Sequence, residues 1–228
     1  MDVLANRPDS ASAARIKAAN DQLSSLDARG RIAWLMRHVG GTTVASTSFG
    51  LQSAVLLHLW SEVAGREPVV FVDTGYLFPE TLEYAALLTK RLDLDLRIWR
   101  PDPALAWSPA ATAKLREGGA AALGAYNQVH KVDPFREALR ELDASAWVTG
   151  IRRSQSQPRQ ALEILSQRFG CWRLSPLADW GDEEIQRYLR AHRLPRHPLD
   201  SHGFESLGDT HSTEAARATG SHGRFFGL

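Results

Sequence analysis

The sequence predicts one α/β domain with a doubly wound, mostly parallel β-sheet flanked by helices. Two observations predict this fold. Short apolar, β-branched segments alternate with longer segments of helical periodicity, and turns of small or polar residues separate them. The chain also has 228 residues, of which 43% are hydrophobic, as expected of one globular domain with a sizeable core. In such a fold, ligands bind at the carboxyl ends of the strands.

The elements follow one another in an order that defines three regions. Residues 1–42 are predicted to hold N-terminal helices that pack on the core, residues 43–194 to form a nucleotide-binding α/β core, and residues 195–228 to form a loop region without clear periodicity. The predicted strands are 42–45, 68–72, 94–99 and 146–149. The predicted helices are 11–26, 31–38, one from Ser53, one opened by Pro79, part of 114–128, 133–142 and one after Trp180.

Composition excludes several classes of protein. The net charge of +1 gives no reason to expect nucleic acid or membrane binding, and no apolar run approaches the ~20 residues that span a bilayer. The first ten residues lack the apolar core of a signal peptide, so we expect a cytoplasmic protein. Cys171 is the single cysteine, so these 228 residues can form no intramolecular disulfide and no Cys-ligated zinc or iron–sulfur site.

The first segment that suggests chemistry is S-T-S-F-G-L-Q-S, residues 46–53, between a predicted strand and a predicted helix. The hydroxyls of Ser46, Ser48 and Ser53 and the N–H groups of a helix start can hold a phosphate or a sulfate. Gly50 would let an anion approach the backbone. The alternative is a β–α turn capped by serines, and this segment alone does not decide between the two.

The same segment resembles the phosphate loop of the adenine nucleotide α-hydrolase-like group, usually written S-G-G-x-D-S. Here Phe49 replaces one glycine and Gln52 replaces the aspartate. Members that cleave ATP use the acidic position to handle magnesium pyrophosphate. A neutral Gln52 argues against ATP cleavage, because magnesium prefers anionic oxygen ligands.

Four further segments narrow the resemblance to one family. They are D-T-G-Y-L-F-P-E-T at 73–81, T-G-I-R-R-S-Q-S at 149–156, P-L-A-D-W at 176–180, and H-P-L at 197–199 followed by G-F-E-S-L-G-D-T-H-S-T at 203–213. Together with the serine-rich segment they resemble the phosphoadenylyl-sulfate (PAPS) reductases, from about residue 43 to residue 228. The resemblance implies reduction of PAPS to sulfite and adenosine 3′,5′-bisphosphate in sulfate assimilation.

PAPS carries a phosphosulfate and a 3′-phosphate, so its site must neutralise several negative charges. Arg152 and Arg153 follow a predicted strand end and Arg159 is near in sequence, and guanidinium groups suit phosphate and sulfate oxygens. Asp73 could bind a ribose hydroxyl or the adenine amine, or cap the following turn. The predicted substrate-binding residues are Ser46, Ser48, Phe49, Gly50, Gln52, Ser53, Asp73, Thr74, Gly75, Gly150, Arg152, Arg153, Arg159, His211 and Arg224, with Lys131 as a further candidate.

The resemblance also implies a nucleophile outside these residues. In the family, a segment like G-R-F-F-G-L leads into a mobile C-terminal tail with Glu-Cys-Gly-Leu-His, so the catalytic cysteine is expected beyond Leu228 and no catalytic residue within the 228. Whether that tail is disordered, truncated or absent stays open. Its thiolate would take the sulfo group from PAPS, and thioredoxin or glutaredoxin would release sulfite. Cys171, beside aromatic residues, is expected to be a buried small hydrophobe.

The resemblance implies a homodimer that binds no flavin, metal or iron–sulfur cluster and takes its electrons from thioredoxin. The spacings of His197, His202 and His211 match no zinc pattern. Adenylyl sulfate reductases carry a four-iron cluster on cysteines that this chain lacks, although activity on adenylyl sulfate stays open. Two further functions compete with the reductase interpretation, namely an ATP-dependent nucleotidyl transferase or pyrophosphatase and a non-catalytic nucleotide-binding module.

Overall fold

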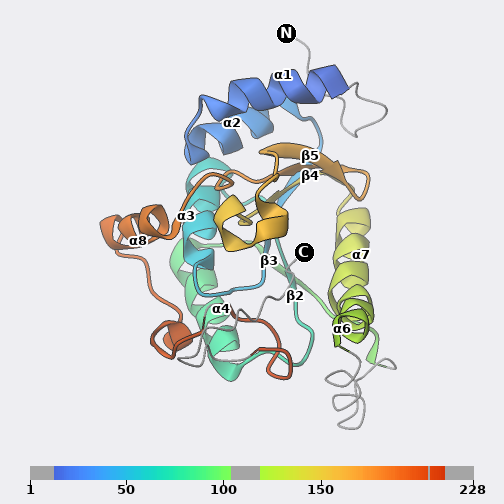
Figure 1. Cartoon of the computed structure of the whole chain (residues 1–228), viewed down its shortest axis with the longest axis vertical. Coiled ribbons are helices and arrows are strands. Elements are labelled where there is room, and N and C mark those ends of the chain that lie inside the picture. The colour runs from blue at the N-terminus through green and yellow to red at the C-terminus, as the bar shows by residue number, and fades with distance from the viewer. Residues whose placement is uncertain (1–12, 104–118, 205, 214–228) are drawn as a thin grey trace.

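A computed structural model describes residues 13–103, 119–204 and 206–213 of the chain (Figure 1). Its centre is a six-stranded sheet in the order β3-β2-β1-β4-β6-β5, in which only β5 is antiparallel to its neighbour. The strands are β1 (Thr42–Thr47), β2 (Val69–Val72), β3 (Leu96–Trp99), β4 (Ala144–Thr149), β5 (Leu165–Arg168) and β6 (Cys171–Leu174). The predicted doubly wound, mostly parallel α/β fold is confirmed.

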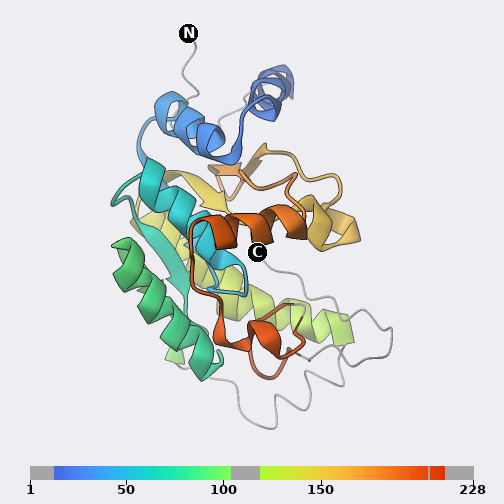
Figure 2. The same ribbon diagram turned by 90° about the vertical axis from the view of Figure 1, so that its left-hand side faces the viewer.

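Helices cover both faces of the sheet (Figures 1 and 2). The α-helices are α1 (Ala13–Ser24), α2 (Ala28–His38), α3 (Ser53–Val63), α4 (Pro79–Leu92), α6 (Gly119–Asn127), α7 (Asp133–Glu141) and α8 (Asp182–Ala191). A π-helical turn, Gln128–Val132, joins α6 to α7, and short 3₁₀ turns lie at Arg153–Gln155, Gln157–Arg159 and Pro198–Ser201.

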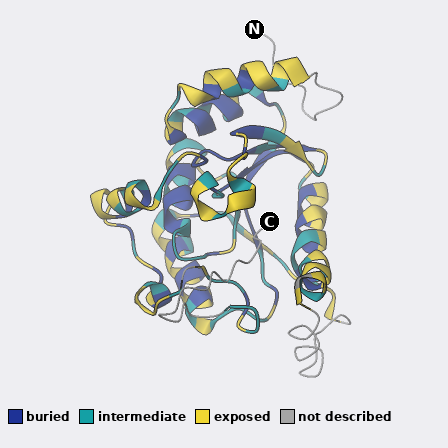
Figure 3. Cartoon of the chain, in the orientation of Figure 1, coloured by how far each residue is buried: buried dark blue, intermediate teal, exposed yellow. Residues whose placement is uncertain are grey.

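The buried residues form one apolar layer on each face of the sheet. The larger layer joins α1, α2, α3, α4 and α8 to the sheet, with Leu35, Leu57 and Leu88 among its fully buried members. The smaller layer joins α7 to the other face, where Phe135 contacts Trp147 edge-on at 4.9 Å. Figure 3 shows α4 and α7 buried toward the sheet and exposed on their outer sides, as amphipathic helices require, whereas α3 is buried or intermediate at every residue but Glu62.

Two side chains attach the N-terminal helices to the sheet. Arg31 is 2% exposed and forms a bidentate ion pair with Asp179 at 2.6 and 2.7 Å, and it also donates to the carbonyl of Pro176 at 2.8 Å. On α1, the Asn20 amide donates to the carbonyl of Leu165 at 2.8 Å, and its side-chain oxygen accepts from the Leu165 N–H at 2.9 Å. The Asn20 contacts hold α1 against the outer edge of β5, and the Arg31 contacts hold α2 against the loop after β6.

No helix among the described residues is long and apolar enough to cross a membrane.

Candidate functional site

The chain reverses the direction in which strands are added to the sheet between β1 and β4. From β1 it adds β2 and β3 on one side, and it then crosses to β4 on the other side of β1. The two strands are parallel, with Ser46 of β1 opposite Thr149 of β4, so the loops that follow them begin next to each other. This is the switch point at which open α/β sheets bind their ligands. Residues 48–52 and 150–156, both selected from the sequence, therefore lie at one site.

The loop after β1 is held by its own residues. Phe49 has a φ of +50°, and its side chain is fully buried against Phe71, so any contact that it makes with a ligand must come from its main chain. The Ser46 hydroxyl donates to the carbonyl of Val148 at 3.3 Å, and the Ser53 hydroxyl donates to that of Gly50 at 2.8 Å. Ser48 is the exposed serine of the three, and its hydroxyl is the one best placed to meet a ligand.

The loop after β4 begins at Gly150 and contains a buried cation. Arg152 is 3% exposed, and its guanidinium donates to the side-chain oxygen of Gln52, to Asp182 at 2.9 Å and to the Trp180 carbonyl at 3.3 Å. The Arg152 hydrogen bond lowers the pKa of Asp182. Gln52, at the position where ATP-cleaving relatives of the fold carry an acid, thus binds Arg152. A guanidinium beside this loop repels a magnesium ion, which prefers anionic oxygen ligands.

Arg153 and Arg159 lie in the same loop region and donate to neutral acceptors. The Nε of Arg153 donates to the carbonyl of Leu162 at 2.8 Å, and Arg159 donates to the side-chain oxygen of Gln155. Burial, followed by the charge of Arg152, lowers the pKa of Arg159. The two arginines therefore bring positive charge to this side of the switch point, and guanidinium groups suit the oxygens of an anionic ligand.

The segment after β2 caps its own turn. Asp73 accepts from the N–H of Gly75 at 3.0 Å and forms an ion pair with Arg100 at 3.0 Å, and Gly75 has a φ of +80° that suits glycine. Of the two roles left open for Asp73, the structure shows the capping role. The Thr74 side chain is buried and donates to the carboxylate of Asp209, 135 residues further along the chain.

That contact belongs to a C-terminal segment, residues 206–213, which docks beside these loops. Asp209 is fully buried, pairs with Lys131 at 2.9 Å and forms an antiparallel bridge with Leu77. The N–H of Thr210 donates to the carbonyl of Tyr76 at 2.8 Å. A Cβ placed on Gly50 would lie 4.0 Å from the carbonyl oxygen of Leu207, so the segment also reaches the loop after β1.

Aromatic rings surround the docked segment. The ring of His211 meets the rings of Tyr76 and Tyr126 edge-on, at 5.4 and 4.6 Å between centroids. Tyr126 is stacked on the buried His130 at 4.2 Å. Burial, followed by the charge of Asp209, raises the pKa of Tyr126, so its phenol stays protonated. His211 and Lys131, both expected at the site, therefore lie together at the place where the C-terminal segment meets the core.

The structure thus gathers most of the residues selected from the sequence, and Arg224 lies outside the described residues. Asp209, Asp182 and Gln155 were not selected, although all three hold site loops through their side chains. A signal existed for Asp209, because it stands in the same G-D-T-H run as His211. Direct ligand contacts of the selected residues stay predictions.

Cys171 lies away from these loops. It is the first residue of β6, which runs parallel to β4, so it sits at the amino-terminal edge of the sheet. Its side chain is 4% exposed, and its thiol donates to the carbonyl of Ala144 at 3.1 Å. The prediction that Cys171 is a buried small residue is confirmed.

His197, one of the three histidines considered for a zinc site, makes structural contacts. His197 is buried, accepts from the N–H of Leu199 at 3.1 Å and lies 3.1 Å from the Thr81 hydroxyl, so it caps the short turn that follows it. Among the residues that the structure describes, no three His, Cys, Asp or Glu side chains are grouped to hold a metal ion.

Comparison with known proteins agrees with this arrangement. A family model described as the phosphoadenosine phosphosulfate reductase domain matches residues 42–215. A phosphoadenosine 5′-phosphosulfate reductase of Xanthomonas axonopodis pv. citri is 46% identical over 198 residues, 87% of this chain and 82% of its own. One from Vibrio cholerae is 43% identical over 216 residues, covering 94% and 85%.

Solved structures agree as well. The PAPS reductase of Candida auris, solved as a phosphate complex, superposes with a TM-score of 0.75 at 27% identity, over 90% of this chain and 99% of its own. An FMN adenylyltransferase of Candida glabrata has a TM-score of 0.61 at 19% identity, over 94% and 72%, and shares the fold. Since the family model spans both the switch-point loops and the docked segment, and the relatives align over most of their length, the chain belongs to the phosphoadenosine phosphosulfate reductase family.

Proposed function

We propose that this protein reduces 3′-phosphoadenylyl sulfate to sulfite and adenosine 3′,5′-bisphosphate, with reduced thioredoxin as the electron donor. The observation that carries the proposal is the docking of residues 206–213 beside the switch-point loops through the buried Asp209. The chain that follows this segment departs from the site at which the nucleotide would bind. This arrangement supports a nucleophile carried on the chain that follows.

The nucleophile in this proposal is a cysteine beyond Leu228. Its thiolate attacks the sulfate sulfur, an S–S bond forms, and the S–O bond to the nucleotide breaks, so that adenosine 3′,5′-bisphosphate leaves with the bonding pair. A thiolate of reduced thioredoxin then attacks the cysteine sulfur and releases sulfite. The second thioredoxin thiol resolves the mixed disulfide, so two electrons pass from thioredoxin to the sulfur. The burial of Cys171 at the opposite edge of the sheet supports a nucleophile from elsewhere.

The residues of the described site would bind and orient the nucleotide. Ser48 and the backbone at the start of α3 would hold anionic oxygens, while Arg153 and Arg159 would offset the charge of the phosphosulfate. Arg152 acts through its neighbours, because its guanidinium ties the loop after β1 to α8. We further propose that the protein is a cytoplasmic homodimer without bound flavin, metal or iron–sulfur cluster.

Intact mass measurement tests the proposed intermediate. The full-length protein is incubated with PAPS in the absence of thioredoxin, and we expect the mass to rise by one sulfo group. Addition of reduced thioredoxin should return the mass to its starting value and release one equivalent of sulfite. Proteolytic mapping should find the adduct on a peptide other than the one that contains Cys171.

Cys171→Ser is the matched control variant. Because the Cys171 thiol is buried and bonded to a backbone carbonyl, this variant should form the adduct as the unchanged protein does. Loss of the adduct in a folded Cys171→Ser protein would overturn the assignment of the nucleophile. A protein that binds PAPS tightly but gains no mass and yields no sulfite would instead be a nucleotide-binding module.

A further inference from the structure

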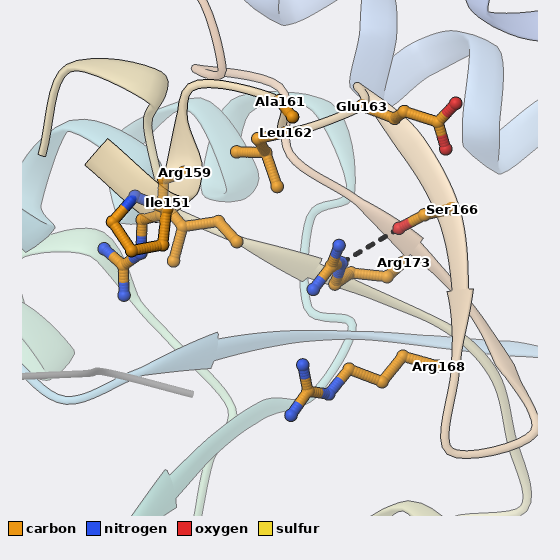
Figure 4. A pocket seen from close by; sticks show the side chains of 9 residues that line it. Ile151, Arg159, Ala161, Leu162, Glu163, Ser166, Arg168 and Arg173 are labelled. Carbon is orange, nitrogen blue, oxygen red and sulfur yellow. Dashed lines mark hydrogen bonds between the residues drawn. The ribbon is translucent and has the colours of Figure 1, made fainter. Parts of the chain in front are cut away.

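The candidate site has two flanks of different chemistry. On one side, the turn after β4 and the β5–β6 hairpin enclose a pocket of about 400 Å³, which is lined by Arg159, Arg168 and Arg173 (Figure 4). On the other side, the docked segment 206–213 packs on aromatic rings. The first flank offers charge to a ligand, whereas the second fixes the position of a segment of the chain. The second flank contains a buried histidine, His130, that the proposed function does not use.

His130 lies in the π-helical turn Gln128–Val132, between α6 and α7. Here the N–H of Asp133 donates to the carbonyl of Gln128, five residues earlier, where an α-helix would use a spacing of four. Residues five apart across this turn therefore take the place of residues four apart, and the buried His130 and Phe135 have this spacing. A single π-helical turn within a helix is rare and is frequently found at a functional site.

The imidazole of His130 holds the ring of Tyr126, four residues earlier. The two rings are stacked at 4.2 Å between centroids with 13° between their planes, and the residues are 1% and 0% exposed. The Nδ1 of His130 lies 3.2 Å from the carbonyl oxygen of Tyr126, and since a carbonyl only accepts, Nδ1 is the donor of this hydrogen bond. The hydrogen bond fixes the plane of the imidazole, and the imidazole in turn fixes the plane of the phenol ring.

Tyr126 connects His130 to the docked segment. Its ring meets the ring of His211 edge-on at 4.6 Å between centroids. Lys131, the residue after His130, forms the ion pair with Asp209 at 2.9 Å, and its ammonium lies 5.9 Å from the centre of the Tyr126 ring. The π-helical turn therefore holds the segment through one aromatic and one ionic contact, and both depend on the backbone and the ring of His130.

His130 does not itself reach a ligand. Its side chain is buried, and one face of its ring is covered by Tyr126. Any effect of His130 on the reaction must therefore pass through the residues that it holds, which makes it distinct from a residue that contacts the substrate.

We propose that His130 is a positioning residue for sulfo transfer, and that its ring, stacked on Tyr126, holds residues 206–213 in the place that the reaction needs. The inference rests on the proposed function, because it concerns the segment from which the chain that bears the nucleophile departs. A displacement of about 1 Å can slow a positioned reaction by about 100-fold. Loss of the stacked ring should therefore slow formation of the cysteine S-sulfo adduct, while the loops that bind the nucleotide keep their affinity.

Two substitutions at His130 separate the ring from the hydrogen bond. His130→Gln keeps an N–H donor without a ring, and His130→Phe keeps a ring without a donor. The full-length proteins are mixed with saturating PAPS in the absence of thioredoxin, and the intact mass is followed over time. We expect His130→Gln to form the adduct about 10- to 100-fold more slowly, and His130→Phe to stay within about threefold of the unchanged protein. By isothermal titration, the dissociation constant for adenosine 3′,5′-bisphosphate should change by less than about threefold in both variants.

His38 provides a matched control. Its ring is stacked on Trp34 at 4.3 Å, and its Nδ1 lies 2.7 Å from the carbonyl oxygen of Trp34, four residues earlier, so it repeats both contacts of His130. It ends α2, at the opposite end of the molecule from the docked segment (Figures 1 and 2). His38→Gln should therefore leave the rate of adduct formation unaltered. If His130→Gln does not fold, His130→Leu replaces it, because leucine fills the space without a ring or a buried polar group.

The outcomes separate the inference from the proposed function. If the unchanged protein forms no adduct, the proposed function is wrong, and the inference with it. If the unchanged protein and His130→Gln form the adduct at the same rate, or if His130→Phe is slowed as much as His130→Gln, the ring of His130 does not position the segment. An equal loss of rate in His38→Gln, or a loss of bisphosphate affinity as large as the loss of rate, would mean general destabilisation. Either result would overturn the inference while the proposed function stands.

Discussion

Asp209→Asn is the substitution whose effect follows most directly from the structure. The Asp209 carboxylate is fully buried, pairs with Lys131 at 2.9 Å and accepts from the hydroxyl of Thr74. Asparagine has nearly the same shape and keeps an acceptor for Thr74, but it removes the negative charge. The variant therefore isolates the contribution of the ion pair to the docking of residues 206–213.

The magnitude follows from the burial of the two partners. Breaking a fully buried ion pair costs about 3–5 kcal/mol. The Lys131 side chain is 23% exposed and can be partly solvated after the change, so we expect the smaller loss of about 2–3 kcal/mol. At tenfold per 1.4 kcal/mol, this predicts that the docked segment opens about 30 to 150 times more often.

Hydrogen exchange measures this opening directly. The Thr210 N–H, which donates to the carbonyl of Tyr76 at 2.8 Å, should exchange about 30 to 150 times faster in Asp209→Asn. Asp93→Asn is the matched control, because Asp93 is 77% exposed in its ion pair and has a φ of +48°, which asparagine tolerates. In Asp93→Asn, the Thr210 N–H should exchange at the same rate as in the unchanged protein.

Two results would refute this reasoning. A change of less than threefold at Thr210 would mean that the Asp209–Lys131 pair does not hold the segment. Equal acceleration at Thr210 and at amides of the central strand β1 would mean that the pair stabilises the whole domain and has no special effect on the docked segment.

Three further predictions concern stability. Arg31→Lys, which cannot keep the bidentate pair with Asp179, should lower the free energy of unfolding by about 2–4 kcal/mol in urea denaturation; an unchanged midpoint would contradict this. Phe49→Ala should lower it by about 3–5 kcal/mol, because a fully buried ring is lost from a loop that keeps its positive φ; a loss below 1 kcal/mol would mean that the loop closes over the space. Burial lowers the pKa of His197 below 6.5, so the unfolded chain binds a proton that the fold excludes, and stability should fall as the pH drops below 6.5. His197→Asn should make that decline shallower while still capping Leu199, and parallel pH profiles for the two proteins would rule this cause out.

All four strands predicted from the sequence are present, and 42–45 and 94–99 correspond to β1 and β3 with shifts of two residues at one end. The segments at 68–72 and 146–149 correspond to β2 and β4 with shifts of one or two residues at their ends. The β5–β6 hairpin was missed as a pair of strands because L-S-Q-R, at the edge of the sheet, holds one apolar residue, and Arg173 interrupts the apolar residues of C-W-R-L. Helix α2 begins at Ala28, three residues before the predicted start, because Asp27 accepts from the N–H of Gly30 at 2.7 Å.

From the sequence, the candidate site could be placed at one edge of the sheet, but the contacts within it could not be predicted. Residues at strand ends, such as Gly150 and Arg152, could be assigned to one edge of the sheet because parallel strands end together. The partners of these residues could not be assigned, since Thr74 and Asp209 are 135 positions apart and only the folded chain joins them. For the same reason, no local pattern indicates that Gln52 accepts from Arg152, 100 positions away.

The contact between Asn20 and Leu165 has a consequence for how this protein meets other chains. An edge strand presents unpaired backbone groups that can recruit a strand from another molecule. At Leu165 both groups are already taken, because the amide of Asn20 offers one donor and one acceptor in the manner of a neighbouring strand. Helix α1 therefore blocks this end of β5 against strand addition. Extension of the sheet past Leu165 would first require α1 to detach, so another chain that meets the folded protein at this end of β5 should contact side chains.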